Sequence, residues 1–218
     1  MKIRFTKIKQ RKSLTLWGWL VVVICMTTIT FVWMKTIHNF LAVNKPIDTH
    51  ILIIEGYVPD FVLIDLAAEA KRNSKLLLVC AGLPMSKAIF CDSYKNDAEY
   101  NAAALQYFGV DSLQIINAPV SFIEKERTYT TALAAKEKLR ENGYTSGKIN
   151  IICVGTHARR SWYLYRKAFK KDWKVGVISY QNNTYIPELW WHSSEGARNV
   201  VYEMFAYLYC IIFFHSTN

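Results

Sequence analysis

Residues Ile151–Phe169, IICVGTHARRSWYLYRKAF, decide the fold. The stretch begins as an apolar run of strand length and ends with apolar residues at helical spacing. A short polar turn joins the two halves, and it contains Gly155, Thr156, His157, Arg159 and Arg160. A buried strand that leads through a turn into a helix is the unit from which parallel α/β sheets are built.

The same alternation repeats along the body of the chain. Short apolar runs predict five strands, at His50–Glu55, Lys75–Gly82, Leu113–Pro119, Ile149–Gly155 and Trp173–Tyr180. Helical spacing predicts five helices, at Asp60–Arg72, Asp97–Phe108, Tyr129–Asn142, Ala158–Lys170 and Ser194–Phe214. The strand runs lack polar alternation, as expected where helices cover both faces of a sheet. The sequence therefore predicts a Rossmann-like α/β sandwich of three layers with about five mainly parallel strands.

The segment Ser13–Met34 contains no charged residue. At about 1.5 Å per residue, a helix of this length spans a hydrocarbon core of roughly 30 Å. Six basic residues precede the segment and only Lys35 closely follows it, which predicts a cytoplasmic N-terminus. We expect a basic cytoplasmic tail (1–12), a transmembrane anchor (13–34), a linker (35–47) and an exported α/β domain (48–218). A cleaved signal peptide is the alternative, although its apolar region would be shorter.

Charge and motifs exclude several classes of function. Six of the 27 basic residues precede Ser13 and none of the 17 acidic residues does, so the body is only mildly basic. It carries no basic stripe interleaved with aromatic residues, and we predict no nucleic-acid partner. No GxGxxG or P-loop occurs, so the sequence supports neither a dinucleotide nor ATP, and it identifies no cofactor.

The five cysteines show no CxxC or Cys/His spacing, and the sequence predicts no metal site. Cys80 and Cys153 lie in apolar runs and are expected to be small core residues. A disulfide between Cys80 and Cys91 is conceivable outside the cytoplasm, and the sequence leaves it open.

The turn after the fourth strand is the main candidate site, because open parallel sheets bind ligands beyond the carboxyl ends of their strands. Gly155 permits a tight turn, and the hydroxyl of Thr156 can cap the helix that follows. The free N–H groups of a first helical turn attract an anion. His157 and Arg160 can face one side, with Arg159 beside them as a further cation. His157 is the candidate acid or base, and a salt bridge to Glu55 or Glu203 is the structural alternative.

Other residues are expected at the same edge. Glu55 and Gly56 follow the first strand, whereas Arg127, Thr128 and Thr131 open the third crossover helix. For each threonine helix capping is the stronger explanation, whereas Arg127 is equally a second anion contact or a solvated charge. Glu203 lies on an apolar helix and is costly unless it is paired, with Arg160 as a possible partner. All of these residues except Glu203 are candidate ligand-binding groups.

The order of these motifs resembles the YdcF/SanA/ElyC family, a domain of unknown function common in bacterial envelopes. The resemblance rests on HILIIEGYVPD (from His50), ERTYTTALAAKEKL (from Glu126), the His157-x-x-Arg160 pair after a strand, and ARNVVYEMFAYL (from Ala197) with Glu203. It covers roughly His50–Tyr209, and the preceding anchor suits a SanA-like member. The family's Thr-x-Glu-Asn is Thr128-Tyr129-Thr130-Thr131 here, so an acid and an amide are replaced.

The resemblance implies a Rossmann-like domain on the periplasmic side of the bacterial inner membrane, linked to envelope integrity, peptidoglycan or polysaccharide metabolism. We expect a membrane-anchored protein that binds an anionic small molecule, such as a phosphorylated or nucleotide-linked glycan precursor. The alternative is a non-catalytic, membrane-associated interaction protein. The sequence does not decide between an enzyme and a binding protein.

Overall fold

The computed structural model describes residues 13–85, 94–121 and 126–214. The chain divides into two compact units, residues 1–37 and 38–218. The predicted basic tail and Cys91, one half of the conceivable disulfide, lie outside the described residues.

Helix α1, Leu16–Leu41, begins in the first unit and ends in the second. Within the described part of the chain it is the one helix long and apolar enough to cross a membrane. It continues past Met34, so the first residues of the predicted linker are helical. Nothing in Lys35–Leu41 breaks a helix, and the first proline after it is Pro46.

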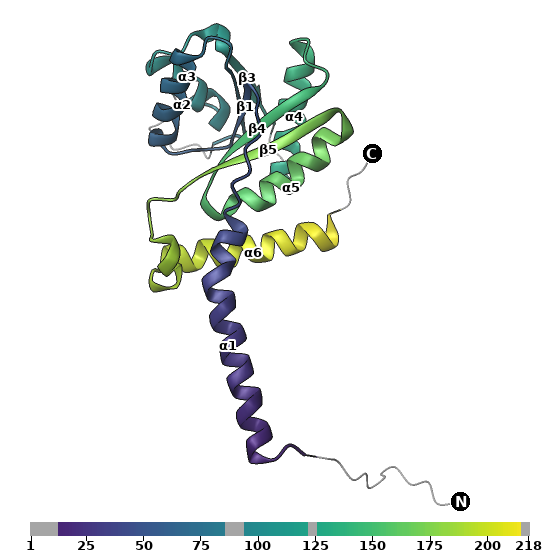
Figure 1. Ribbon diagram of the computed structural model, residues 1–218. Coiled ribbons are helices and arrows are strands. Elements are labelled where there is room, and N and C mark those ends of the chain that lie inside the picture. The colour runs from purple at the N-terminus through teal and green to yellow at the C-terminus, as the bar shows by residue number, and fades with distance from the viewer. Residues whose placement is uncertain (1–12, 86–93, 122–125, 215–218) are drawn as a thin grey trace, which may run out of the picture. The chain divides into compact units, whose positions relative to one another are not determined.

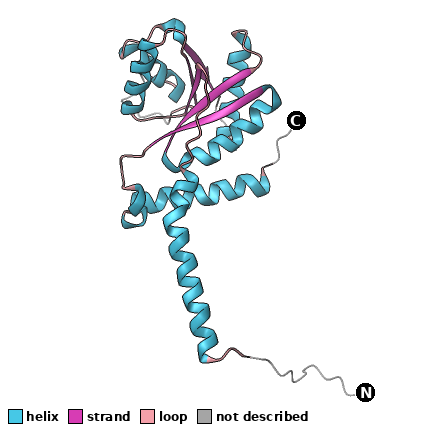
Figure 2. Ribbon diagram, viewed as in Figure 1, coloured by secondary structure: helices cyan, strands magenta, loops and turns pink. Residues whose placement is uncertain are grey.

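The second unit is built on a sheet of five parallel strands in the order β3-β2-β1-β4-β5 (Figures 1 and 2). The strands are β1 Ile51–Glu55, β2 Leu77–Gly82, β3 Ile115–Pro119, β4 Gly147–Val154 and β5 Trp173–Tyr180. The predicted α/β fold class is therefore confirmed. Because β1 lies between β2 and β4, the strand order reverses between β1 and β4.

The helices form the outer layers of the sandwich. They are α2 Asp60–Arg72, α3 Asp97–Tyr107, α4 Arg127–Glu141, α5 Ala158–Phe169 and α6 Ser194–Phe213. Alternate residues of β1 separate the two faces: Ile51 and Ile53 pack with α4 and α5, whereas Leu52 and Ile54 pack with α2 and α3. All four side chains are buried, which explains why the strand lacks polar alternation. Helix α6 contacts α5 and the turn that follows β4.

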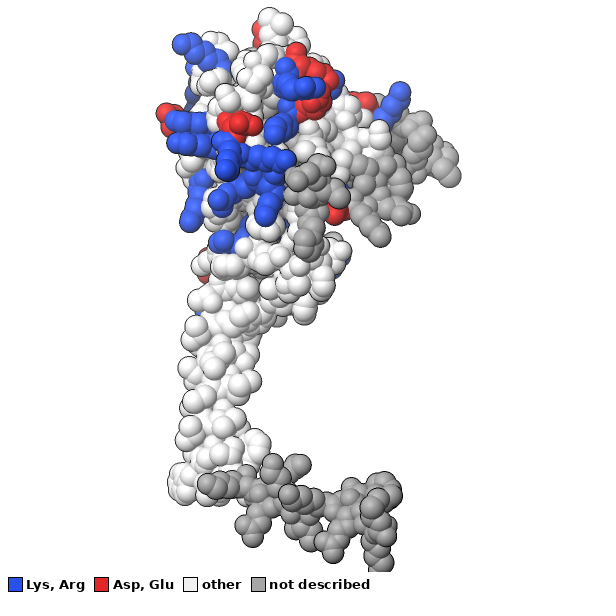
Figure 3. Space-filling view, turned by 90° about the vertical axis from the view of Figure 1, so that its right-hand side faces the viewer, with Lys and Arg blue, Asp and Glu red and all other residues white. Residues whose placement is uncertain are grey.

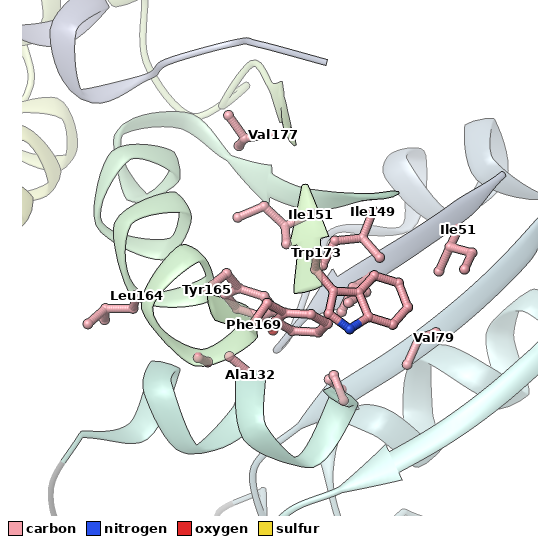
Figure 4. Packing of buried hydrophobic residues seen from close by; sticks show 14 of the residues in the cluster. Ile51, Val79, Ala132, Ile149, Ile151, Leu164, Tyr165, Phe169, Trp173 and Val177 are labelled. Carbon is pink, nitrogen blue, oxygen red and sulfur yellow. The ribbon is translucent and has the colours of Figure 1, made fainter. Parts of the chain in front are cut away.

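Three aromatic side chains dominate the core on the α4/α5 face (Figure 4). The ring of Phe169 stacks on Tyr165 at 6.0 Å between centroids and meets the edge of Trp173 at 5.5 Å. Phe169 and Tyr165 are fully buried, so the end of α5 is fixed against the start of β5.

The chain enters this unit along the outer edge of β5. The backbone N–H of Lys45 donates to Val177 O at 2.8 Å, and Val177 N–H donates back at 3.0 Å. The side-chain amide of Asn150, buried in β4, holds the backbone of Ile47 through hydrogen bonds of 3.0 and 2.8 Å. Residues just before the predicted domain start at 48 are therefore part of its structure.

Phe169→Ala should lower the free energy of unfolding by about 3 kcal/mol, because it leaves a cavity between Tyr165 and Trp173. For a domain of this size the thermal midpoint should fall by about 10 °C. Thermal unfolding of the full chain in nanodiscs, followed by near-UV circular dichroism, measures the change. Tyr107→Ala, at an 86% exposed position, is the control and should leave the midpoint nearly unchanged. Equal midpoints for both variants would contradict the packing.

Candidate functional site

The candidate site lies at the carboxyl edge of the sheet, where the strand order reverses. Glu55 is the last residue of β1, and His157 ends a short 3-10 turn, Gly155–His157, directly after β4. Strands β1 and β4 are neighbours, so their ends bring both side chains together. Ligands of open α/β sheets bind at such a reversal point.

His157 is held between two carboxylates. Its Nδ1 lies 2.9 Å from Glu203 Oε1, and its Nε2 lies 3.3 Å from Glu55 Oε1. Both acidic side chains are nearly buried, whereas 30% of the His157 side chain is exposed. Glu55, His157 and Glu203 form one group of charged side chains, and the imidazole of His157 is its most accessible member. The contact of His157 Nε2 with Glu55 is longer, and therefore looser, than the contact of Nδ1 with Glu203.

Arg160 completes the group from the first turn of α5. Its Nε donates to Glu203 Oε2 at 2.8 Å, and Nη2 donates to Oε1 at 3.0 Å. Its Nη1 donates to the Thr128 hydroxyl at 3.2 Å, which joins the start of α4 to the group. Nη2 also lies 2.9 Å from His157 Nδ1. When His157 is protonated both nitrogens are donors, so this approach reflects their shared acceptor, Glu203 Oε1.

These contacts set the charges of the group. Burial opposes protonation of His157, but Glu55 and then Glu203 outweigh it and raise the pKa of His157 to about 9. Burial raises the pKa of Glu203, but the hydrogen bonds from Arg160 and His157 outweigh it and bring the pKa to about 2. The pKa of Glu55 is also lowered, because His157 overcomes its burial. Two carboxylates thus face an imidazolium and a guanidinium near neutral pH.

Gly155 and Thr156 shape the turn. Gly155 has φ +57°, a left-handed conformation that favours glycine, and a Cβ there would lie 3.3 Å from Asn182 Cβ. Thr156 is buried, and its hydroxyl lies 3.4 Å from Asn199 O on α6. The expected helix cap by Thr156 is wrong, because the 3-10 turn makes His157 the residue before α5, without a side-chain cap. Thr156 instead fastens the turn to α6.

Three other residues that the sequence suggested for the site, Arg159, Thr131 and Gly56, make contacts of their own outside this group. Arg159 points away from the group: its guanidinium lies over the Phe40 ring, 3.9 Å from the centroid, and Nε donates to Phe40 O. The Thr131 hydroxyl donates to Arg127 O at 2.9 Å within α4. Gly56, with φ +63°, accepts a hydrogen bond from Asn101 at its carbonyl and donates its N–H to Ala81 O. The structure therefore brings together Glu55, Thr128, His157, Arg160 and Glu203, and not Arg159 or Thr131.

Arg127 lines a cavity next to the group. The cavity has a volume of about 490 Å³, and Thr128 and Arg160 form part of its polar wall. Tyr202, Phe205 and Tyr209 of α6 form part of its aromatic wall. Among the residues that the structure describes, no carboxylate lies within ion-pair distance of Arg127. A guanidinium next to aromatic rings can hold an anionic, ring-containing ligand.

Two further residues of the site do not stand out in the sequence. The Cys153 thiol donates to Glu55 Oε2 at 3.6 Å, and burial followed by Glu55 raises its pKa, so it is a donor and not a thiolate. Asp97, the first residue of α3, lies beside Gly56, and burial raises its pKa despite Arg127. The signal for Asp97 was its position after the second strand, since each crossover helix of this fold starts at the same edge.

Basic side chains also gather away from this site, as Figure 3 shows on one face. A cavity of about 670 Å³ is lined by Arg166, Lys167, Lys170 and Lys174. Trp162 contributes to its wall, with the guanidinium of Arg166 5.1 Å from the ring centroid. Trp162, Arg166 and Lys167 belong to α5, and the fold adds Lys170 and Lys174 from the segments that follow it. The expectation of no nucleic-acid partner stays a prediction.

Among the described residues, no group of three or more His, Cys, Asp or Glu side chains could hold a metal ion. Comparison of the chain with protein-family models, with curated proteins and with solved structures found no match.

The shifted pKa values of His157 and Glu203 should make the free energy of unfolding depend on pH. The folded pKa of His157 is raised from 6.5 to about 9, so its stabilisation is complete below pH 6.5 and is lost as the pH rises through 9. The folded pKa of Glu203 is lowered from 4.5 to about 2, so its stabilisation is complete above pH 4.5 and is lost as the pH falls toward 2. Urea unfolding of the full chain should show a loss of about 2 kcal/mol between pH 6.5 and 9.

His157→Gln should remove this alkaline loss, because glutamine does not titrate. His50→Gln, at an exposed position, is the matched control and should keep the wild-type profile. An alkaline loss of equal size in His157→Gln would show that His157 is not its source.

Proposed function

We propose that this protein is a membrane-anchored envelope protein whose exported domain binds an anionic small molecule at the carboxyl edge of its sheet. Helix α1 is the anchor, with the N-terminus in the cytoplasm and the domain on the outer side of a bacterial inner membrane. The length and composition of α1 and the six basic residues before it support this arrangement. The resemblance to the YdcF/SanA/ElyC family supplies the envelope setting.

The pairing of Glu55 and His157 at the strand-order reversal carries the proposal. The imidazolium is partly exposed there, and its looser Nε2–Glu55 contact of 3.3 Å can be shared with a ligand oxygen. With a pKa near 9, His157 is a cationic donor at neutral pH and suits the role of an acid rather than a base. Arg127 supplies a second cation at the cavity beside it.

A phosphorylated or nucleotide-linked glycan precursor fits this set of groups best. Its phosphate would bind the guanidinium of Arg127, with Thr128 as a neighbouring hydroxyl. Its ring would lie against the aromatic wall formed by Tyr202 and Tyr209. Arg160 serves this site mainly by holding Glu203, because its charge is already paired.

Arg127→Ala should weaken the binding of such a ligand about tenfold, a loss of about 1.4 kcal/mol. The measurement is the thermal stabilisation of the full chain in nanodiscs by nucleotide sugars and sugar phosphates. Arg159→Ala, which removes an arginine that stacks on Phe40, should leave the ligand-dependent stabilisation unchanged. Equal stabilisation of the Arg127→Ala variant and the wild type would reject binding at this cavity.

A non-catalytic interaction protein is the second candidate. The observation in its favour is the balance of charge: Glu55 and Glu203 already satisfy His157 and Arg160, as in a structural ion-pair network. Partners captured by the full chain would then survive Arg127→Ala and be lost on substitution of Trp191, which is only partly buried. Loss of partners with Arg127→Ala would favour the ligand-binding function instead.

A further inference from the structure

The outward face of α6 is apolar over three turns. Val201, Phe205, Leu208 and Ile212 follow one another at helical spacing and are all exposed, with Phe205 at 62% and Ile212 at 60%. We call these four residues the outer row of α6. An outward face of this kind on a water-soluble domain would normally carry polar side chains.

No charged side chain lies on this outward face between Val201 and Phe213. Between Val201 and Phe213 the one charged residue is Glu203, which points inward to Arg160 and His157. Gly196, Val200 and Cys210 share the buried side with it. Tyr202 and Tyr209 lie beside the outer row and are 64% and 62% exposed. Tyrosine in such a position favours the boundary between lipid and water.

A short segment of the chain, Lys35–Phe40, tethers α6 to the anchor. The ring of Phe40 lies 5.9 Å from the ring of Tyr207 on α6, a contact within the second unit of the chain. Phe40 is only six residues after Met34, the last residue of the uncharged segment, and α1 is helical between them. This corresponds to about 9 Å along a helix, close to the depth of the headgroup layer. The covalent link through Lys35–Phe40 thus limits how far α6 can lie from the membrane that holds the anchor.

We propose that the outer row of α6 inserts into the interface of the lipid bilayer that holds the anchor, as a second membrane contact of the protein. The inference rests on the anchoring proposed for α1. Burial of the exposed apolar surface of these side chains in the lipid stabilises the docked state. Because the tether makes lipid contact intramolecular, the bilayer is present at far higher effective concentration than a second copy of the chain.

Site-specific photo-crosslinking of the full chain in nanodiscs of phosphatidylcholine and phosphatidylglycerol tests this contact. The photoreactive residue p-benzoyl-phenylalanine replaces Leu208, Leu113 or Phe31 in separate samples. Leu113 is the matched leucine control: it is 87% exposed and lies just before β3, at the amino end of the sheet. Phe31 in α1 reports on the anchor itself. Mass spectrometry measures the lipid adducts.

The expected result is about tenfold more lipid adduct at Leu208 than at Leu113, with strong labelling at Phe31. In a Val201→Glu background the yield at Leu208 should fall about tenfold, while labelling at Phe31 persists, because a charge in the outer row disfavours insertion. Labelling at Phe31 without labelling at Leu208 would overturn the α6 contact alone. Failure at Phe31 would overturn the anchoring as well. Crosslinked dimers at Leu208 would show that a second copy covers this face, and would also overturn the proposal.

Discussion

The site depends on the contacts that the buried carboxylate of Glu203 makes with Arg160 and His157. A buried charge on an apolar helix costs several kcal/mol unless it is paired. Here it accepts hydrogen bonds from Arg160 Nε and Nη2 and lies 2.9 Å from His157 Nδ1. These contacts fasten α6 to the turn after β4 and, through Thr128, to the start of α4. Glu203 thus helps to fix the position of α6, which supplies aromatic residues to the wall of the neighbouring cavity.

The same pairing determines what His157 can do. An imidazole between two carboxylates is a stable cation, which weakens it as a proton acceptor and strengthens it as a donor. The network also removes much of the positive charge that the turn shows in the sequence. Among the cations of the described site, Arg127 has no carboxylate within ion-pair distance, although Asp97 interacts with it electrostatically, and it comes from a different crossover. An anionic ligand would therefore meet the site from the side of α4, with α6 opposite.

The sequence predicted the fold closely, because each element carries its own signal. The limits of α2 and β5 agree with the prediction, and the others shift by a few residues at their ends. The start of β3 differs because Ser112–Gln114 forms a 3-10 turn with Asp111 as its cap, a local hydrogen bond that hydrophobicity does not reveal.

The site was less predictable than the fold. The rule for parallel sheets identified the edge, and Glu55, His157, Arg160 and Glu203 do meet there. Helical spacing placed Arg160 on the side of His157, but it kept Arg159 as a further candidate, because only packing shows that Arg159 turns toward Phe40. Asp97 escaped notice because an acidic residue at a helix start is common.

The contact of Lys45 with Val177 has a consequence for association between copies of the chain. Strand β5 is one border of the sheet, and an uncovered border is a template for pairing with other chains. The segment that leads out of α1 lies along this border, and Asn150 holds it there by the backbone of Ile47. The chain's own segment thus covers part of this border, which opposes strand exchange with another copy of the chain.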